Sequence, residues 1–132
     1  MRTLIIIAAC AGLLALSGVS DAAQMASPSI FGSIEQFKAE CSIVNAGTSP
    51  QAVTIRIYDD FGTLFGTSTC DGTVPPGGFC ALTVSIENAE AYACVATAGA
   101  TGNLRGSLVL HRRLLDSFGL FYFDPVRSAP LR

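Results

Sequence analysis

The 132-residue sequence contains no tryptophan, a single histidine and only 14% charged residues. With one histidine, a transition-metal site built from several imidazole ligands is not expected. The five cysteines never occur in a C-x-x-C spacing, so the sequence indicates neither a thioredoxin-type redox pair nor a zinc ribbon. The formal net charge of −2 argues against a general nucleic-acid binder. We therefore expect no metal, no cofactor and no nucleic-acid partner.

The N-terminus has the three parts of a secretory signal peptide. Arg2 supplies a positive charge, residues 4–16 form an apolar run, and small residues follow. The best cleavage site is at residues 20–22, with cleavage after Ala22. The apolar run has about 13 residues, whereas a membrane-spanning helix needs about 20, which disfavours a membrane anchor. We predict a secreted or periplasmic protein with no stable membrane span after signal cleavage.

Two features complete the predicted organisation of the chain. Residues 7–10 resemble a lipoprotein lipobox ending at Cys10, an alternative that the continuing apolar run disfavours. Cleavage after the signal, residues 1–22, leaves about 110 residues, the size of one domain. Because residues 23–34 are small and polar, we expect a flexible N-terminal arm there, followed by a single domain over 35–132.

The mature chain shows the period-two alternation of β-strands, with turn residues between the runs. No long stretch has helical periodicity, although residues 112–117 allow a single turn of helix. Short alternating strands predict an all-β fold, an antiparallel two-sheet sandwich of about seven strands. The expected strands are 37–44, 51–58, 63–69, 79–87, 91–98, 104–110 and 118–123.

Four cysteines remain after signal cleavage, and export leads to an oxidising compartment, so we expect two disulfides. Four cysteines allow three pairings. Cys41 and Cys94 each lie in the inward phase of a predicted strand and can bridge two facing sheets. Cys70 and Cys80 flank a loop rich in glycine and proline and can close it. The phases therefore favour Cys41–Cys94 with Cys70–Cys80.

Part of this pattern resembles the immunoglobulin fold. Cys41 and Cys94 on separate strands, with Tyr92 two residues before the second cysteine, resemble the inter-sheet disulfide and tyrosine corner of that family. The segment 74–78 and the alternation that follows it are similar to bacterial immunoglobulin-like and fibronectin type III-like modules. The core tryptophan of antibody domains is absent. The resemblance implies a sandwich and transfers no functional residue.

Serines and carboxylates that could carry catalysis are available, but none stands in a catalytic motif. His111, the only histidine, lies on the polar phase of its strand, where a solvent-exposed role is favoured over that of a catalytic base. Asp59, Asp60 and Asp71 could bind Ca²⁺, but aspartates in such clusters are also ordinary turn residues. The sequence thus predicts no catalytic residue and no metal ligand, and an enzyme is the weakest interpretation.

The most unusual local feature is the aromatic segment 118–123, which precedes an arginine-containing tail. It predicts either a buried last strand or, if the strand lies at a sheet edge, a surface for a partner. The candidate partner surface comprises Phe121, Phe123, Arg112 and Arg113.

These observations favour a non-enzymatic module for binding, adhesion or surface structure, with an unknown protein or glycan partner. One alternative is a carbohydrate- or small-ligand-binding domain that uses exposed aromatics such as Tyr58 and Tyr122. A second alternative is a subunit of an extracellular assembly that pairs through residues 118–123.

Overall fold

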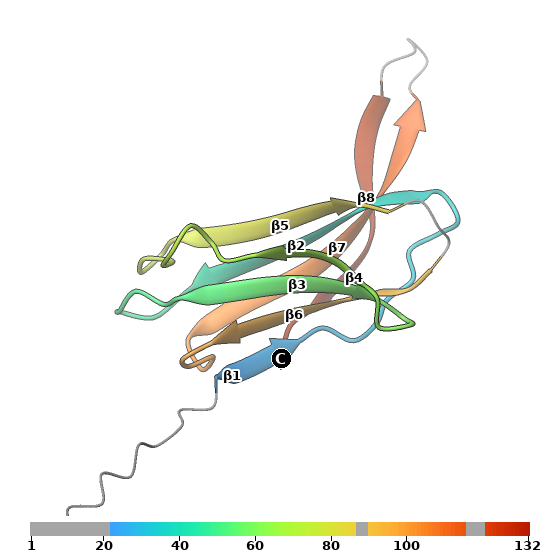
Figure 1. The fold of residues 1–132 in the computed structure, drawn as a ribbon. Coiled ribbons are helices and arrows are strands. Elements are labelled where there is room, and N and C mark those ends of the chain that lie inside the picture. The colour runs from blue at the N-terminus through green and yellow to red at the C-terminus, as the bar shows by residue number, and fades with distance from the viewer. Residues whose placement is uncertain (1–21, 87–89, 116–120) are drawn as a thin grey trace, which may run out of the picture.

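The computed structural model describes residues 22–86, 90–115 and 121–132, and these residues form eight β-strands and no helix. The strands make two antiparallel four-stranded sheets that lie face to face (Figure 1). Sheet A has the order β1-β6-β3-β4, and sheet B has the order β5-β2-β7-β8. The strands of sheet A are β1 (Ala23–Ala26), β6 (Tyr92–Ala98), β3 (Val53–Asp59) and β4 (Leu64–Ser68). Those of sheet B are β5 (Phe79–Ser85), β2 (Gln36–Asn45), β7 (Leu104–Leu115) and β8 (Phe121–Pro130).

The predicted all-β sandwich is confirmed, with eight strands where about seven were expected. No helix among the described residues is long and apolar enough to cross a membrane. The expected turn of helix over 112–117 is wrong for its described part, because residues 112–115 continue strand β7. The predicted strand over 118–123 corresponds to β8 from Phe121 onward, and its first three residues lie outside the described part of the chain.

The expected flexible arm over 23–34 is also corrected, because its first residues form β1 and pair with β6. The hydroxyl of Ser27 accepts a hydrogen bond from the N–H of Cys94 at 2.9 Å. Farther along, Ile30 pairs with Tyr92 as an isolated bridge. The N-terminal segment is therefore part of the sandwich, and nothing in its own sequence alternation predicts this distant pairing.

The core follows from the alternation of the strands. In β3 and β6, every second residue is buried between the sheets, as period-two patterning requires. A fully buried aliphatic side chain contributes about 1.5–3 kcal/mol through the hydrophobic effect. The largest fully buried apolar side chains are Tyr92, Ile43, Ile55, Ile57, Ile86, Leu104, Leu108 and Leu110.

Two disulfides reinforce this core, and both are those favoured by the strand phases. Cys41–Cys94 links β2 of sheet B to β6 of sheet A, with 6.1 Å between the Cα atoms, and both residues are fully buried. Cys70–Cys80 links the end of β4 to the start of β5, with 5.6 Å between the Cα atoms. One bridge therefore crosses the core, and the other joins the two sheets at one end.

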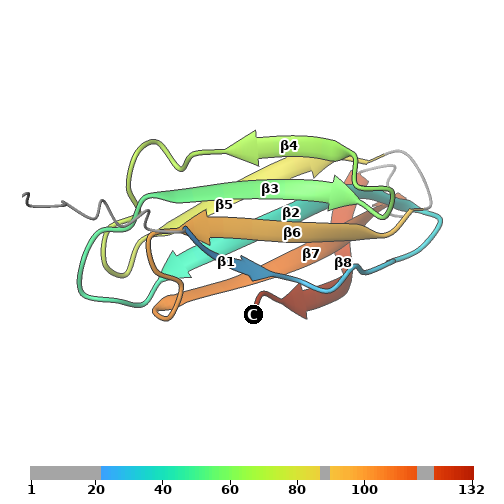
Figure 2. The same cartoon turned by 60° about the horizontal axis from the view of Figure 1, so that its bottom comes forward.

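The C-terminus closes one side of the sandwich (Figure 2). The N–H of Ala26 donates to the carbonyl of Arg132 at 2.9 Å, and the N–H of Arg132 donates back to Ala26 at 3.0 Å. Leu131, which is buried, donates its N–H to the carbonyl of Gly106. A side chain at Gly106 would lie 2.9 Å from the carbonyl oxygen of Ser42, so glycine allows this close packing.

The first and seventh strands lie in other sheets here than in an immunoglobulin domain. In the immunoglobulin fold the first strand shares a sheet with the second and fifth, and the seventh shares a sheet with the third and sixth. Here β1 shares a sheet with β3 and β6, whereas β7 shares a sheet with β2 and β5. The resemblance to immunoglobulin domains stays a prediction beyond the level of a β-sandwich.

Replacing each disulfide by alanine pairs should destabilise the protein to different degrees. In the chain-entropy model, loss of Cys41–Cys94 costs about 4 kcal/mol and loss of Cys70–Cys80 about 3 kcal/mol, because the first closes a longer loop. Urea unfolding of the two double variants would measure this. A smaller loss for Cys41→Ala/Cys94→Ala than for Cys70→Ala/Cys80→Ala would contradict the role assigned to the core bridge.

Candidate functional site

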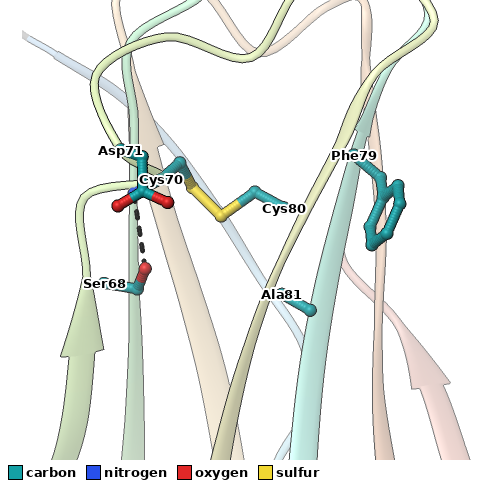
Figure 3. A pocket seen from close by; sticks show the side chains of 6 residues that line it. All are labelled: Ser68, Cys70, Asp71, Phe79, Cys80 and Ala81. Atoms are coloured by element: carbon teal, nitrogen blue, oxygen red, sulfur yellow. Dashed lines mark hydrogen bonds between the residues drawn. A yellow bond between two sulfur atoms is a disulfide. The ribbon is translucent and has the colours of Figure 1, made fainter.

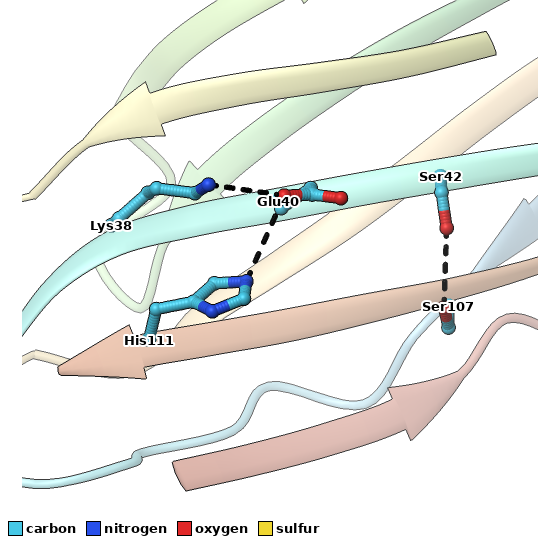
Figure 4. A network of polar contacts seen from close by, with 5 residues as sticks. All are labelled: Lys38, Glu40, Ser42, Ser107 and His111. Atoms are coloured by element: carbon cyan, nitrogen blue, oxygen red, sulfur yellow. Dashed lines mark hydrogen bonds and ion pairs between the residues drawn. The ribbon is translucent and has the colours of Figure 1, made fainter. Parts of the chain in front are cut away.

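The outer face of sheet B carries a polar network (Figure 4). Glu40 on β2 lies 3.2 Å from the Nζ of Lys38 and 3.7 Å from the Nε2 of His111 on β7. Farther along the same two strands, the hydroxyls of Ser42 and Ser107 lie 3.3 Å apart. The strand register explains these contacts, because Lys38 pairs with His111 and Ser42 with Ser107. The network therefore ties β2 to β7 across the sheet surface.

His111 lies on the outer face, as predicted, but within β7 rather than at a strand end, and it is half-buried. A nucleophile and its base must lie within about 3 Å of each other. Ser107 lies four residues away along the strand, which corresponds to about 13 Å. Ser107 is therefore too far from His111 to be activated by it, and the contact between Glu40 and His111 fits an inter-strand contact of modest strength.

A pocket opens where β4 ends and β5 begins (Figure 3). Its volume of about 310 Å³ lies at the small end of ligand pockets, which have about 300–1,000 Å³. The Cys70–Cys80 disulfide forms part of its wall. The lining residues are Ser68, Cys70, Asp71, Phe79, Cys80 and Ala81.

The backbone beside this pocket takes an unusual conformation. Cys70 and Asp71 have φ angles of 53° and 48°, in the left-handed region that residues with side chains seldom adopt. The N–H of Cys70 donates to the hydroxyl of Ser68 at 3.3 Å. These two left-handed residues turn the chain out of β4 and aim Cys70 at Cys80. The pocket wall is thus held by both a covalent bond and a tight turn.

An apolar patch lies next to the pocket on the outer face of sheet B. Phe79 on β5 is 75% exposed, and Val44, its cross-strand neighbour on β2, is 42% exposed. Arg105 of β7 is the neighbour of Val44 on the other side. Directly opposed side chains in a sheet lie about 4.5–5.5 Å apart at their Cβ atoms. Phe79, Val44 and Arg105 therefore form one row across three strands.

The aspartates considered as Ca²⁺ ligands have different roles in the structure. The Oδ1 of Asp59 accepts the N–H of Phe61 at 3.0 Å and that of Thr63 at 2.6 Å. This carboxylate therefore shapes the β3–β4 turn, the ordinary role of an aspartate in such a cluster. Asp71 lines the pocket instead. Within the described ranges, no group of three or more metal-ligating side chains occurs.

Tyr92 is the largest buried side chain, and its hydroxyl has no hydrogen-bond partner among the described residues. Its ring packs edge-on against that of Phe65, with the centroids 5.2 Å apart. Burial raises the pKa of Tyr92 above 10.0, and the nearby carboxylate of Glu90 raises the pKa further. The hydrogen bond that a tyrosine corner would make is thus not seen within the described chain.

Beyond the end of β2, the last two strands form a two-stranded ribbon. The β2–β7 pairing ends at Gln36 and Arg112, whereas residues 113–115 still pair with residues 121–123 of β8. A register shift interrupts the β7–β8 pairing just before this point, and such bulges bend a strand. The ribbon rises away from the rest of the sandwich (Figure 1).

The ribbon contains three residues of the candidate partner surface, and the fourth, Arg112, lies at its base as the last β7 residue paired with β2. Arg113 pairs with Phe123, and Arg112 and Phe121 lie on the same two strands. Arg113 is exposed and Arg112 is half-buried, whereas the side chains of the two phenylalanines lie outside the described set. The β8 strand is an edge strand of sheet B. The condition attached to the partner-surface hypothesis, an edge position, is therefore met.

The aromatics considered for carbohydrate binding do not come together. Tyr58 lies on the outer face of sheet A and is half-buried, whereas Tyr122 belongs to β8 of sheet B. The side chain of Tyr122 lies outside the described set. Phe79 and the pocket beside it were not expected from the sequence, because Asp71-Gly72 predicts a turn but not the left-handed backbone of Cys70 and Asp71 that shapes the pocket wall.

Comparisons with known proteins identify no relative that suggests a function. No family model matches the chain, and no curated protein matches it. Among solved structures, Thermotoga maritima 1070 is similar at 9% identity and a TM-score of 0.43, covering 79% of this chain and 91% of its own. A structure described as an ApaA protein from Bordetella pertussis has 14% identity and a TM-score of 0.23, with 84% and 92% covered. Likenesses at these scores carry no argument about function.

The variant Tyr92→Phe should lose a pH dependence that the natural chain shows. The raised pKa of Tyr92 leaves the free energy of unfolding unaffected below pH about 10 and lowers it as the pH rises further, because the unfolded tyrosine releases its proton first. The variant lacks this loss, and at pH about 7 its stability is equal or higher by about 1 kcal/mol, since an unpaired buried hydroxyl is removed. Urea unfolding across this pH range tests both points. Identical alkaline losses in the two proteins would contradict the assignment.

Proposed function

We propose that this chain is an exported, non-enzymatic β-sandwich module that binds a protein partner through the ribbon of residues 113–115 and 121–123. The observation that supports the proposal is the position of this ribbon, whose two strands continue past the end of β2. Inside the sandwich, the facing sheet covers one side of each strand. Beyond it, no third strand among the described residues pairs with β7.

The sequence of the ribbon supports a role in contact. Residues 114–115 and 121–123 are all apolar, so both strand phases carry apolar residues. A water-exposed ribbon would normally alternate apolar and polar residues, as β2 does. Contiguous apolar surface outside a core is typical of a protein–protein contact. Arg112 and Arg113 at its base favour a partner with carboxylates around an apolar centre.

Export is supported by the two disulfides, which form and persist in oxidising compartments. A two-sheet domain of this size buries a small core, and covalent links add the stability that such a core lacks. The proposal includes a signal peptide over residues 1–22 and delivery of the mature chain to either the periplasm or the medium. Glycan or small-ligand binding in the pocket beside Phe79 is the second candidate, favoured by the rigid wall of that pocket.

N-terminal sequencing of the exported protein should begin at Ala23. The reason is that residues 20–22 form the best peptidase site after the apolar run. A chain that begins at Met1, or one that starts at a lipid-modified Cys10, would contradict the proposed processing.

Replacing the two ribbon phenylalanines should abolish partner binding without unfolding the sandwich. The mature chain would serve as bait in periplasmic extract and culture supernatant, with Phe121→Ser/Phe123→Ser as the test and Phe61→Ser as the control. Phe61 is 80% exposed in the β3–β4 turn, which belongs to sheet A, whereas the ribbon strands belong to sheet B. A protein captured by the natural and control baits, but reduced about tenfold or more on the ribbon variant, is expected. Equal capture by all three baits, or binding only on a glycan array, would contradict the proposal.

A further inference from the structure

The sandwich has four edge strands: β1 and β4 in sheet A, and β5 and β8 in sheet B. An edge strand presents backbone N–H and C=O groups that can pair with another chain. Proteins commonly guard such edges with charges, proline, bulges, short strands or covering segments. The four edges of this sandwich differ in how many of these guards they carry.

Three of the edges are guarded. The β8 strand contains Asp124, Pro125, Arg127 and Pro130. The β4 strand has only five residues, and its pairing with β3 is interrupted by a register shift. The β1 strand has only four residues, and the backbone of Arg132 covers part of it through two hydrogen bonds to Ala26.

The β5 strand has none of these guards. Its seven residues include no charge and no proline. Its register with β2 is unbroken from Phe79, which pairs with Val44, to Ser85, which pairs with Lys38. The Cys70–Cys80 disulfide fixes the start of the strand. The β5 edge is therefore regular and uncharged, and its conformation is already fixed in the single chain.

The hydrogen bonds at both ends of β5 show which backbone groups point outward. The N–H of Asn45 donates to Gly78, and the N–H of Ile86 donates to the carbonyl of Phe37. Residues of an antiparallel strand alternate between facing one neighbour and facing the other. The even-numbered residues of β5 thus face β2. The outward groups, none of which is paired among the described residues, belong to Phe79, Ala81, Thr83 and Ser85.

We propose that β5 pairs antiparallel with β5 of a second copy of this chain, about a two-fold axis at Leu82. The two copies of sheet B then become one continuous eight-stranded sheet. This interface is separate from the ribbon and does not depend on the function proposed above.

The strand is complementary to itself in this register. Phe79 lies opposite the partner's Ser85, and Ala81 lies opposite the partner's Thr83. All four outward-facing residues of each strand are used, which gives about eight backbone hydrogen bonds. Because β5 contains no charged residue, the like-charge repulsion that prevents many edge strands from pairing with themselves is absent between the two β5 strands. A two-fold contact of this kind closes after two copies and does not propagate into a fibre through this edge.

Side-chain burial also favours this occupant. Leu82 and Val84 point inward but are only half-buried, because they lie at the open side of the core. In the pair, Leu82 packs against the partner's Leu82. Phe79 is 75% exposed in the single chain, and the partner strand would bury part of its side chain at each end of the paired strands. An extended peptide could pair with the same groups, but only a second copy brings this matched set of uncharged residues.

Sedimentation velocity of the mature, oxidised chain tests the proposal over about 1 μM to about 1 mM, where a small interface is expected to associate. The expected result is a reversible change from the mass of one chain to that of two. Thr83→Pro should raise the dissociation constant about 30-fold or more, because it removes an outward N–H on each strand while leaving the bonds to β2 intact. Thr83→Ala, which keeps that N–H, should dimerise like the natural chain.

A charge exchange keeps the test decisive if the proline variant fails to fold. Ala81→Lys/Thr83→Lys and Ala81→Glu/Thr83→Glu should each be monomeric alone, because like charges face each other across the axis. Mixed in equal amounts, they should form a heterodimer. Phe121→Ser/Phe123→Ser should dimerise normally, which separates this interface from the ribbon. A natural chain that stays monomeric throughout would overturn the proposal, even if β5 binds an unrelated peptide. Dimers that persist in both charge variants would overturn it as well.

Discussion

The Cys41–Cys94 disulfide joins the centre of sheet B to the centre of sheet A, and the rest of the sandwich depends on this link. Both sulfurs lie in the inward phase of long strands, so the bridge fixes which face of β2 and of β6 is the core. A shift of one residue in either strand would turn that strand's apolar side chains toward water. The second bridge, Cys70–Cys80, then fixes the position of β5 relative to β4 at one end.

The sequence predicted the features that depend on local alternation. The strands that build the core, and the pairing of the four cysteines, follow from period two and strand phase. The β1 strand was missed because its partner β6 lies about seventy residues farther on and four residues are too few to show alternation. The extent of β8 was missed because Pro125 and Pro130 are unfavourable in all but edge strands. The pocket was not predictable, because it depends on Cys70 and Asp71 adopting a left-handed backbone that no residue type there demands.

The structure assigns different roles to the two sheets. Sheet A is bordered by the C-terminus on one side and by a short, bulged strand on the other, so its edges offer little to a partner. Sheet B carries the ribbon, the Phe79–Val44 patch and the unguarded β5 edge, all on one four-stranded layer. Both surfaces proposed for partner contact therefore belong to sheet B, although exposed apolar side chains also occur on β4 of sheet A, at Leu64 and Phe65.

The outward backbone groups of β5 have no partner among the described residues of the single chain, and the proposed dimer pairs them between copies. Amide-resolved hydrogen exchange by NMR measures this directly, at concentrations below and above association. The account predicts that the amides of Phe79, Ala81, Thr83 and Ser85 exchange rapidly in dilute protein and slow down by about tenfold or more as dimers form, while the amides of Cys80, Leu82 and Val84 are protected throughout. Exchange at the four outward amides that does not change with protein concentration would contradict it.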